Sequence, residues 1–561
     1  MNCTETGVSR RDPEIIMRLS RLGSFHQCRL SFMRTLTRRM AIENWQCRRS
    51  LFELDNNGVG RAVYTVTGPH RQYSLVAFAH NLPDAMRSDR VIAEAWDTTF
   101  VLFDGVPTPA DLDRLNKNVP YQESGRLTDS ELTLSRANRS VRLWGIVVDA
   151  LAKGHQPDRE EIRKVGYLLR TTAVYGSGKF GAADREYIED RSELYPPFQA
   201  ELLTVYLIRS FARDLVQHVA NVEGGDQAAT LDPSIAKELG IGNSTGLGMA
   251  PFIINHPILF NNWIIAREEA IARIRSYQRA TIEQQRWFRQ VLQRSEISIS
   301  YWSTNHPIQM KKLAMLRADI DLLNKYVSQK SIWNNYPWNE LIIWSETSLS
   351  VEGQEFVASL ILEPYGHLVD GLSDCMSDVN RHAFVIDGAM TIREIKSLLE
   401  KSFGWAISLD WTQTKNCSRV WYVSAEKLEP RLGERYEDQL EDYEQPLAPA
   451  RDAILAHQTL NSWDGNAAVS DFLLHHPEHR HTVRRAQISR VAPYGEIRDN
   501  TIADSTLPID MLRAKLSFFG ATHFDPRSDR WVRICMYAGA PYPEDLTPEN
   551  ADFWVYPEIA A

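Results

Sequence analysis

The chain is poor in cysteine, and its cysteines form no motif. There are six in 561 residues, with no CxxC pair and no short framework spacing: Cys3, Cys28, Cys47, Cys375, Cys417 and Cys535. This scatter excludes a disulfide scaffold and a cysteine-ligated zinc site, and it is typical of reduced thiols. We therefore expect a cytoplasmic protein.

Long apolar runs and an excess of positive charge are also missing. The most apolar stretch, residues 252–265, is broken by asparagine and proline and is shorter than the roughly 20 residues of a spanning helix. The net charge of -9 argues against nucleic acid, because phosphate binding needs a concentrated basic surface. We expect neither a membrane nor a nucleic acid as partner.

Familiar catalytic motifs are absent as well. The sequence contains no GxSxG nucleophile elbow and no Walker A loop. Gly176, Gly178 and Gly181 follow the GxGxxG order, but a dinucleotide-binding turn follows a strand, whereas residues 158–175 have a helical pattern. The sequence thus indicates no particular cofactor or reaction.

One basic segment departs from the acidic balance of the chain. Residues 1–49 are rich in arginine and poor in acid, with apolar residues near helical spacing. We expect a basic helical arm that packs on a partner subunit, with an organelle-targeting segment as the alternative.

Hydrophobic periodicity predicts an α+β, helix-rich, multidomain chain with small antiparallel sheets. Residues 51–80 alternate like a three-stranded meander, and a further strand is expected at 100–103. Helices are expected from Thr108-Pro109 and at about 128–153, 158–175, 196–222, 258–294 and 307–327. The expected parts are a basic arm (1–49), a small antiparallel sheet with a helical layer (50–225), a long-helix region with a Gly-rich loop (226–345) and an α+β module (346–561).

The last part contains what we interpret as an internal duplication. Residues 381–426 and 485–539 each run in the order strand, helix, strand, with Phe403-Gly404 matching Phe519-Gly520 and Trp421 matching Trp531. A tryptophan-rich stretch before it, residues 331–346, favours core packing, with a ligand wall or subunit contact as alternatives.

The best candidate site is the glycine-rich segment 240–248, which leads into the long helix. We expect a loop whose backbone amides, near a helix start, hold an anion such as a carboxylate or phosphate. The expected substrate-binding residues are Asn243, Thr245, Gly246, Gly248, Asn261, Asn262 and Arg267. Catalytic roles are expected for His256, which titrates near neutrality, and for Ser244 and Glu268.

A second candidate is the histidine cluster His475, His476, His479 and His481. Imidazoles suit zinc, manganese or iron, but Pro477 breaks the helical spacing that an HExxH site uses. This cluster is therefore the weaker candidate.

From these features we expect a homo-oligomeric enzyme that acts on a small carboxylate- or phosphate-bearing metabolite. Lyase, hydrolase and transferase reactions are not distinguished. The alternatives are a non-catalytic oligomeric ligand-binding or assembly protein, and a metal-dependent enzyme that uses the His475–His481 cluster.

Overall fold

The computed structural model describes most of the chain. The described residues are 8–22, 27–83, 95–121, 127–176, 190–196, 198–246, 257–377, 386–408, 410, 421–423, 430–432, 445–446, 450–496, 513, 515–528, 531–552 and 554–556.

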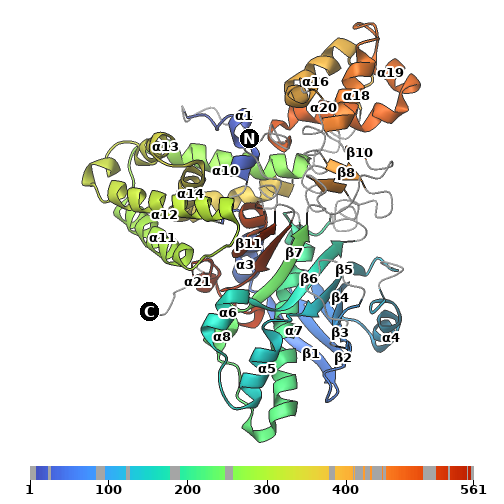
Figure 1. Cartoon of the computed structure of the whole chain (residues 1–561), viewed down its shortest axis with the longest axis vertical. Coiled ribbons are helices and arrows are strands. Elements are labelled where there is room, and N and C mark those ends of the chain that lie inside the picture. The colour runs from blue at the N-terminus through green and yellow to red at the C-terminus, as the bar shows by residue number, and fades with distance from the viewer. Residues whose placement is uncertain are drawn as a thin grey trace.

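A nine-stranded mixed sheet forms the centre of the fold (Figure 1), in the order β1-β2-β3-β4-β5-β6-β7-β12-β11. Its strands are β1 (Gln46–Leu54), β2 (Gly60–Thr67), β3 (Gln72–Ala79), β4 (Thr98–Asp104), β5 (Glu131–Arg139), β6 (Tyr167–Gly176), β7 (Gly240–Gly246), β11 (His523–Ser528) and β12 (Trp531–Met536). Neighbouring strands are antiparallel except β6 and β7, which are parallel. The α+β class is confirmed, but one large mixed sheet replaces the small antiparallel sheets that we expected.

Helices make up the rest of the described chain. Those before β7 are α1 (Pro13–Ile16), α2 (Leu19–Leu22), α3 (Phe32–Ile42), α4 (Pro109–Asn118), α5 (Trp144–Ala152), α6 (Arg159–Val165), α7 (Gln199–Gly224) and α8 (Pro233–Glu238). The later ones are α10 (Pro257–Arg275), α11 (Ile282–Ser300), α12 (Pro307–Val327), α13 (Pro337–Ser348), α14 (Val351–Leu360), α15 (Gly366–Val369), α16 (Ile392–Ile407), α18 (Ala450–Leu460), α19 (Val469–His475), α20 (Arg480–Val491) and α21 (Pro548–Ala551). None of the described helices is both long and apolar enough to cross a lipid bilayer.

Strand alternation places the two faces of the sheet in different cores. In β3, Leu75 and Ala77 belong to the main core with α7, whereas Val76 and Phe78 pack with residues of α4. This follows from the period of two in a strand. The meander over residues 51–80 and the helix start at Thr108-Pro109 were both expected and are present.

Several expected helices are strands or are divided. The expected helices at 128–153 and 158–175 each contain a strand, β5 and β6, because strands buried on both faces lose the alternation that identifies them. Gly176 is therefore the last residue of a strand, β6. Gly178 and Gly181 lie outside the described residues. The expected helix 258–294 is two helices, α10 and α11, with α11 starting from a capping box at Thr281.

The expected strand-helix-strand duplication is not formed as two equivalent units. Residues 485–491, expected as a strand, lie in α20, and Trp531 begins β12 of the main sheet. Trp421 begins β8 (Trp421–Val423), which pairs with β9 (Pro430–Leu432) and β10 (Gln445–Pro446) in a separate small sheet. In the tryptophan-rich stretch, Trp333 and Trp338 are buried in the main core.

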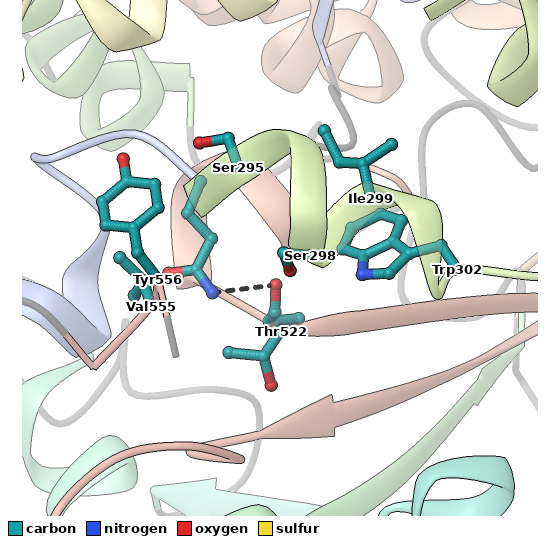
Figure 2. A pocket seen from close by; sticks show the side chains of 9 residues that line it. Ser295, Ser298, Ile299, Trp302, Thr522, Val555 and Tyr556 are labelled. Atoms are coloured by element: carbon teal, nitrogen blue, oxygen red, sulfur yellow. Dashed lines mark hydrogen bonds between the residues drawn. The ribbon is translucent and has the colours of Figure 1, made fainter. Parts of the chain in front are cut away.

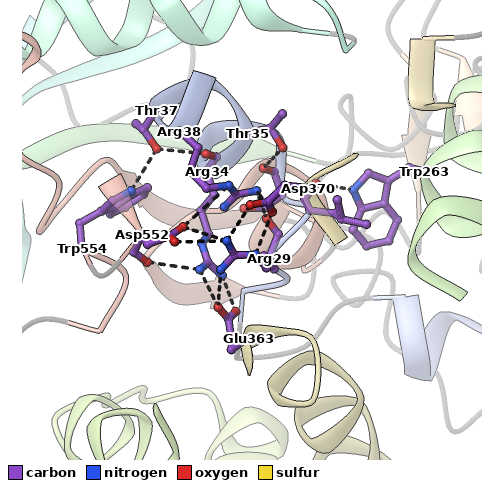
Figure 3. A network of polar contacts seen from close by, with 12 residues as sticks. Arg29, Arg34, Thr35, Thr37, Arg38, Trp263, Glu363, Asp370, Asp552 and Trp554 are labelled. Carbon is purple, nitrogen blue, oxygen red and sulfur yellow. Dashed lines mark hydrogen bonds and ion pairs between the residues drawn. The ribbon is translucent and has the colours of Figure 1, made fainter. Parts of the chain in front are cut away.

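The arginine-rich N-terminal segment packs into the interior of the same chain. Helix α3 is almost entirely buried, including Arg34 and Arg38. Figure 3 shows Arg29 and Arg34 gathered with Glu363 near the C-terminal segment that carries Asp552. The sequence suggested an arm on a partner subunit, but the described part of the segment completes the core of the same chain.

Candidate functional site

The glycine-rich segment 240–246 is an interior strand, not a loop. Residues 241–246 of β7 pair with β12, and residues 240–243 also pair with β6. A side chain at Gly242 would meet the Tyr167 ring at 2.6 Å, so glycine lets the neighbouring strand approach. Because peptide groups in such ladders are hydrogen-bonded to neighbouring strands, those of residues 241–243 are not free to hold an anion.

The other expected residues of this segment are not gathered around a cavity. The side chain of Asn243 is buried, and its Nδ2 donates to Thr171 Oγ1 at 3.2 Å. Ser244, Thr245 and Gly246 are the last residues of β7, and they pair with β12. Gly248 and His256 lie outside the described residues, so their assigned roles remain predictions.

The expected residues of helix α10 fall in two separate places. Near its start, Asn261 Oδ1 accepts a hydrogen bond from the backbone N–H of Tyr494 at 3.1 Å, and Asn262 is half-buried beside it. Arg267 follows Pro257 by ten residues, which is about 15 Å along a helix at 1.5 Å per residue. Arg267 is therefore well separated from the start of α10.

Arg267 and Glu268 belong to a buried cluster of five charged side chains. Arg11 donates from Nε and Nη2 to both carboxylate oxygens of Glu268, each at 2.8 Å. Glu355 accepts from Arg267 at 2.7 Å, from Arg21 at 3.0 Å and from Arg11 at 3.1 Å. Three arginines and two glutamates leave one positive charge in excess among these groups.

The charges of the cluster are maintained by one another. Burial opposes ionisation of Glu355, but Arg11, Arg267 and Arg21 outweigh it and hold the pKa of Glu355 far below its ordinary value. Burial also disfavours the charged form of Arg267, yet Glu355 and Glu268 raise the pKa of Arg267. Both groups are therefore ionised at neutral pH.

A small cavity, with about 10 Å³ of space for a water-sized molecule, opens beside this cluster. Arg21, Arg267 and Glu355 form its charged wall, while Trp263 and Leu22 are among its apolar lining residues. The indole of Trp263 is fixed because its Nε1 donates to the backbone oxygen of Leu30 at 2.9 Å. Of the expected site residues, Arg267 is the one that lines this cavity.

Sequence reasoning missed Arg11, Arg21 and Glu355 as members of the site. The arginine-rich segment that contains Arg11 and Arg21 was evident, but its partners lie more than 300 positions away in Glu355. No spacing rule connects such positions.

A somewhat larger cavity, of about 30 Å³, lies between α11 and the C-terminal segment (Figure 2). Its lining contains Ser295, Ser298, Trp302 and Thr522, together with Gln27. Gln27 Nε2 donates to the backbone oxygen of Ala521 at 3.2 Å. The described lining residues carry no ionised side chain, so this cavity is suited to a neutral molecule or water rather than to an anion.

The histidine cluster converges in part. His476, Glu478 and His479 offer ligand atoms that all lie within 4.8 Å of one another. His475 is directed elsewhere, since its Nδ1 is 2.8 Å from the backbone oxygen of Asp471. His481 is exposed in α20 and is not part of the convergent group found among the described residues.

Comparison of the chain with models of known protein families, with curated proteins and with solved structures finds no match. The functional argument therefore rests on the geometry above.

Proposed function

We propose that this protein binds a small metabolite whose carboxylate or phosphate group lies at the cavity lined by Arg21 and Arg267, with the rest of the ligand outside it. The observation that carries the proposal is the excess of one positive charge in the buried cluster next to that cavity. A buried charge is costly without a counterion, and an anionic ligand would supply one.

The types of residue in the wall suit this ligand. Guanidinium groups present several N–H donors in a planar fork that matches carboxylate and phosphate oxygens. The apolar lining, with Trp263 and Leu22, suits the carbon atoms next to that group in an organic anion. The preferred ligand is thus a small organic acid or phosphate ester rather than an inorganic ion.

The same geometry favours binding over turnover at this cavity. Glu355 has a strongly lowered pKa and accepts hydrogen bonds from three arginines, so it is a poor proton donor and a poor base. Glu268, for which we expected a catalytic role, is held by two donors of Arg11. We therefore prefer the ligand-binding alternative to the enzyme, while roles for His256 and Ser244 remain predictions.

The first prediction concerns Arg21. Thermal unfolding would be followed with a panel of mono-, di- and tricarboxylates and sugar phosphates, because a ligand of the native state raises the melting temperature. For the best anion, Arg21→Gln should weaken binding at least about tenfold, since hydrogen bonds to charged groups contribute about 1.5–3 kcal/mol.

A control variant makes the test specific. Arg61→Gln removes a half-buried arginine that pairs with Glu53 at 2.9 Å, and it should leave the affinity unchanged. Wild-type affinity in Arg21→Gln, or no shift with any anion, would contradict the proposal.

A further inference from the structure

The three convergent side chains of the histidine cluster lie on a turn between two helices. Helix α19 ends at His475, residues Pro477–His479 form a short 3-10 turn, and α20 begins at Arg480. Pro477, which removes the i,i+4 spacing of a helical metal site, here places His476 and His479 on the same side as Glu478. This location is separate from the arginine-lined cavity.

The distances among the ligand atoms are close to those of a metal centre. His476 Nδ1 is 3.2 Å from Glu478 Oε1, and His479 Nε2 is 3.9 Å from the same oxygen. With metal–ligand bonds of about 2.0–2.2 Å, ligand atoms of a tetrahedral zinc site lie about 3.3 Å apart. The three ligand atoms all lie within 4.8 Å of one another and Glu478 is 59% exposed, so small side-chain rotations bring them to the spacing of a metal site.

Aromatic side chains orient both imidazoles. The Phe472 ring stacks on His479 with an interplanar angle of 5° and contacts His476 at a centroid distance of 5.2 Å. Trp463 contacts the His476 ring edge-on at 5.8 Å. Phe472 itself belongs to the small core shared by α16, α18, α19 and α20, so the rings are held by a packed unit.

We propose that His476 Nδ1, Glu478 Oε1 and His479 Nε2 bind one zinc ion. Two imidazoles and one carboxylate are a ligand set that zinc accepts, and three protein ligands leave a position for water or an exogenous ligand. The exposed His476 and Glu478 give the ion access from solvent.

One hydrogen bond competes with the metal. Thr459 Oγ1 donates to the backbone oxygen of Leu455 at 2.9 Å, so at its 3.0 Å contact with His479 Nε2 it accepts. Zinc binding replaces this N–H donation, because a metal-bound nitrogen carries no proton. Thr459→Ala removes the competing acceptor and also clears the space next to Nε2, so zinc should bind this variant at least as tightly as the wild type.

The test uses the full chain, stripped of metal by a chelator and titrated with Zn²⁺ in a calorimeter. We expect one zinc per chain at this site, with Glu478→Gln and His476→Ala each weakening binding at least about tenfold. Glu478→Gln is the main variant because the residue is exposed and its replacement spares the core. His475→Ala and His481→Ala are the matched controls and should retain wild-type affinity.

Cobalt titration separates this site from the cysteines. Binding at His476, Glu478 and His479 gives visible d–d bands without a thiolate charge-transfer band, and these bands should be lost in Glu478→Gln. The proposal is overturned if the wild type binds no zinc, if Glu478→Gln and His476→Ala bind it unchanged, or if Thr459→Ala binds it more weakly.

Discussion

At the scale of single residues, the buried carboxylate of Glu363 accepts several hydrogen bonds in the interior. Arg34 donates to its two oxygens at 2.6 and 2.9 Å, Arg29 donates at 3.3 Å, and the Tyr556 hydroxyl donates at 3.0 Å (Figure 3). These partners come from the N-terminal and C-terminal parts of the chain. Glu363 thereby joins segments that are remote in sequence.

Glu363→Gln should therefore destabilise the protein strongly. Removal of one charge from a buried pair leaves the other uncompensated, at a cost of about 3–5 kcal/mol. Denaturant unfolding followed by circular dichroism measures the change.

A surface carboxylate provides the comparison. Glu53 pairs with Arg61 at 2.9 Å but is 55% exposed, so Glu53→Gln should change the unfolding free energy by less than about 1 kcal/mol. Equal effects of the two variants would show that the network around Glu363 has no special role in stability.

At the scale of elements, β7 shows why a glycine-rich stretch can be a strand. A Cβ at Gly240 would lie 2.3 Å from the backbone oxygen of Met536 and 2.7 Å from the backbone nitrogen of Ala538. Glycine is needed because two backbone segments approach closely, and not because the chain turns there. The composition that suggested an anion-binding loop thus reflects packing within the sheet.

Two variants distinguish a glycine in close contact with other backbone atoms from a glycine in open space. Gly240→Ala should lower the unfolding free energy by about 3 kcal/mol, the upper end for overpacking, since backbone atoms cannot move aside like a side chain. Gly145→Ala, in α5 with nothing within 4 Å of the added atom, should raise stability by up to about 1 kcal/mol. Thermal melts of both variants measure these changes in stability. If Gly240→Ala left the stability unchanged, this would contradict the close packing of β7 against β12.

At the scale of the whole molecule, the N-terminal segment is part of the main core. Phe32, Met33 and Leu36 of α3 are each no more than 1% exposed and pack in the same core as α7 and the sheet. Phe32 contacts the rings of Phe198 and Phe519 at centroid distances of 5.1 and 5.9 Å. An early segment therefore holds the middle and the end of the chain together.

Deletion of residues 1–45 should consequently prevent cooperative folding, because it removes buried apolar surface and leaves Glu363 without Arg29 and Arg34. Circular dichroism melts of the truncated chain should lack a sharp transition. A truncated chain that melts like the full chain would instead restore the idea of a detachable arm.

Local signals in the sequence were sufficient for several elements. Alternation identified the meander of β1, β2 and β3, and cap-then-proline punctuation identified the starts of α4 and α12. Helix α4 has one face in the core, so its periodicity is visible in the sequence. Strands β2 and β3 are buried on both faces, and turn residues at 56–58 and 68–69 helped to identify them. In β6 the periodicity is lost, and Tyr167–Gly176 was mistaken for a helix.

The charged sites required the tertiary structure, because their members are distant in sequence. The sequence by itself determined the α+β class, the excess of arginine in residues 1–49 and the presence of a histidine cluster. Only the fold decided that Arg11 and Arg21 meet Glu355, that Arg267 borders a cavity, and that His476 and His479 converge on Glu478. The physical reason is that charge pairing and cavity formation depend on distances in space, which short-range patterns do not encode.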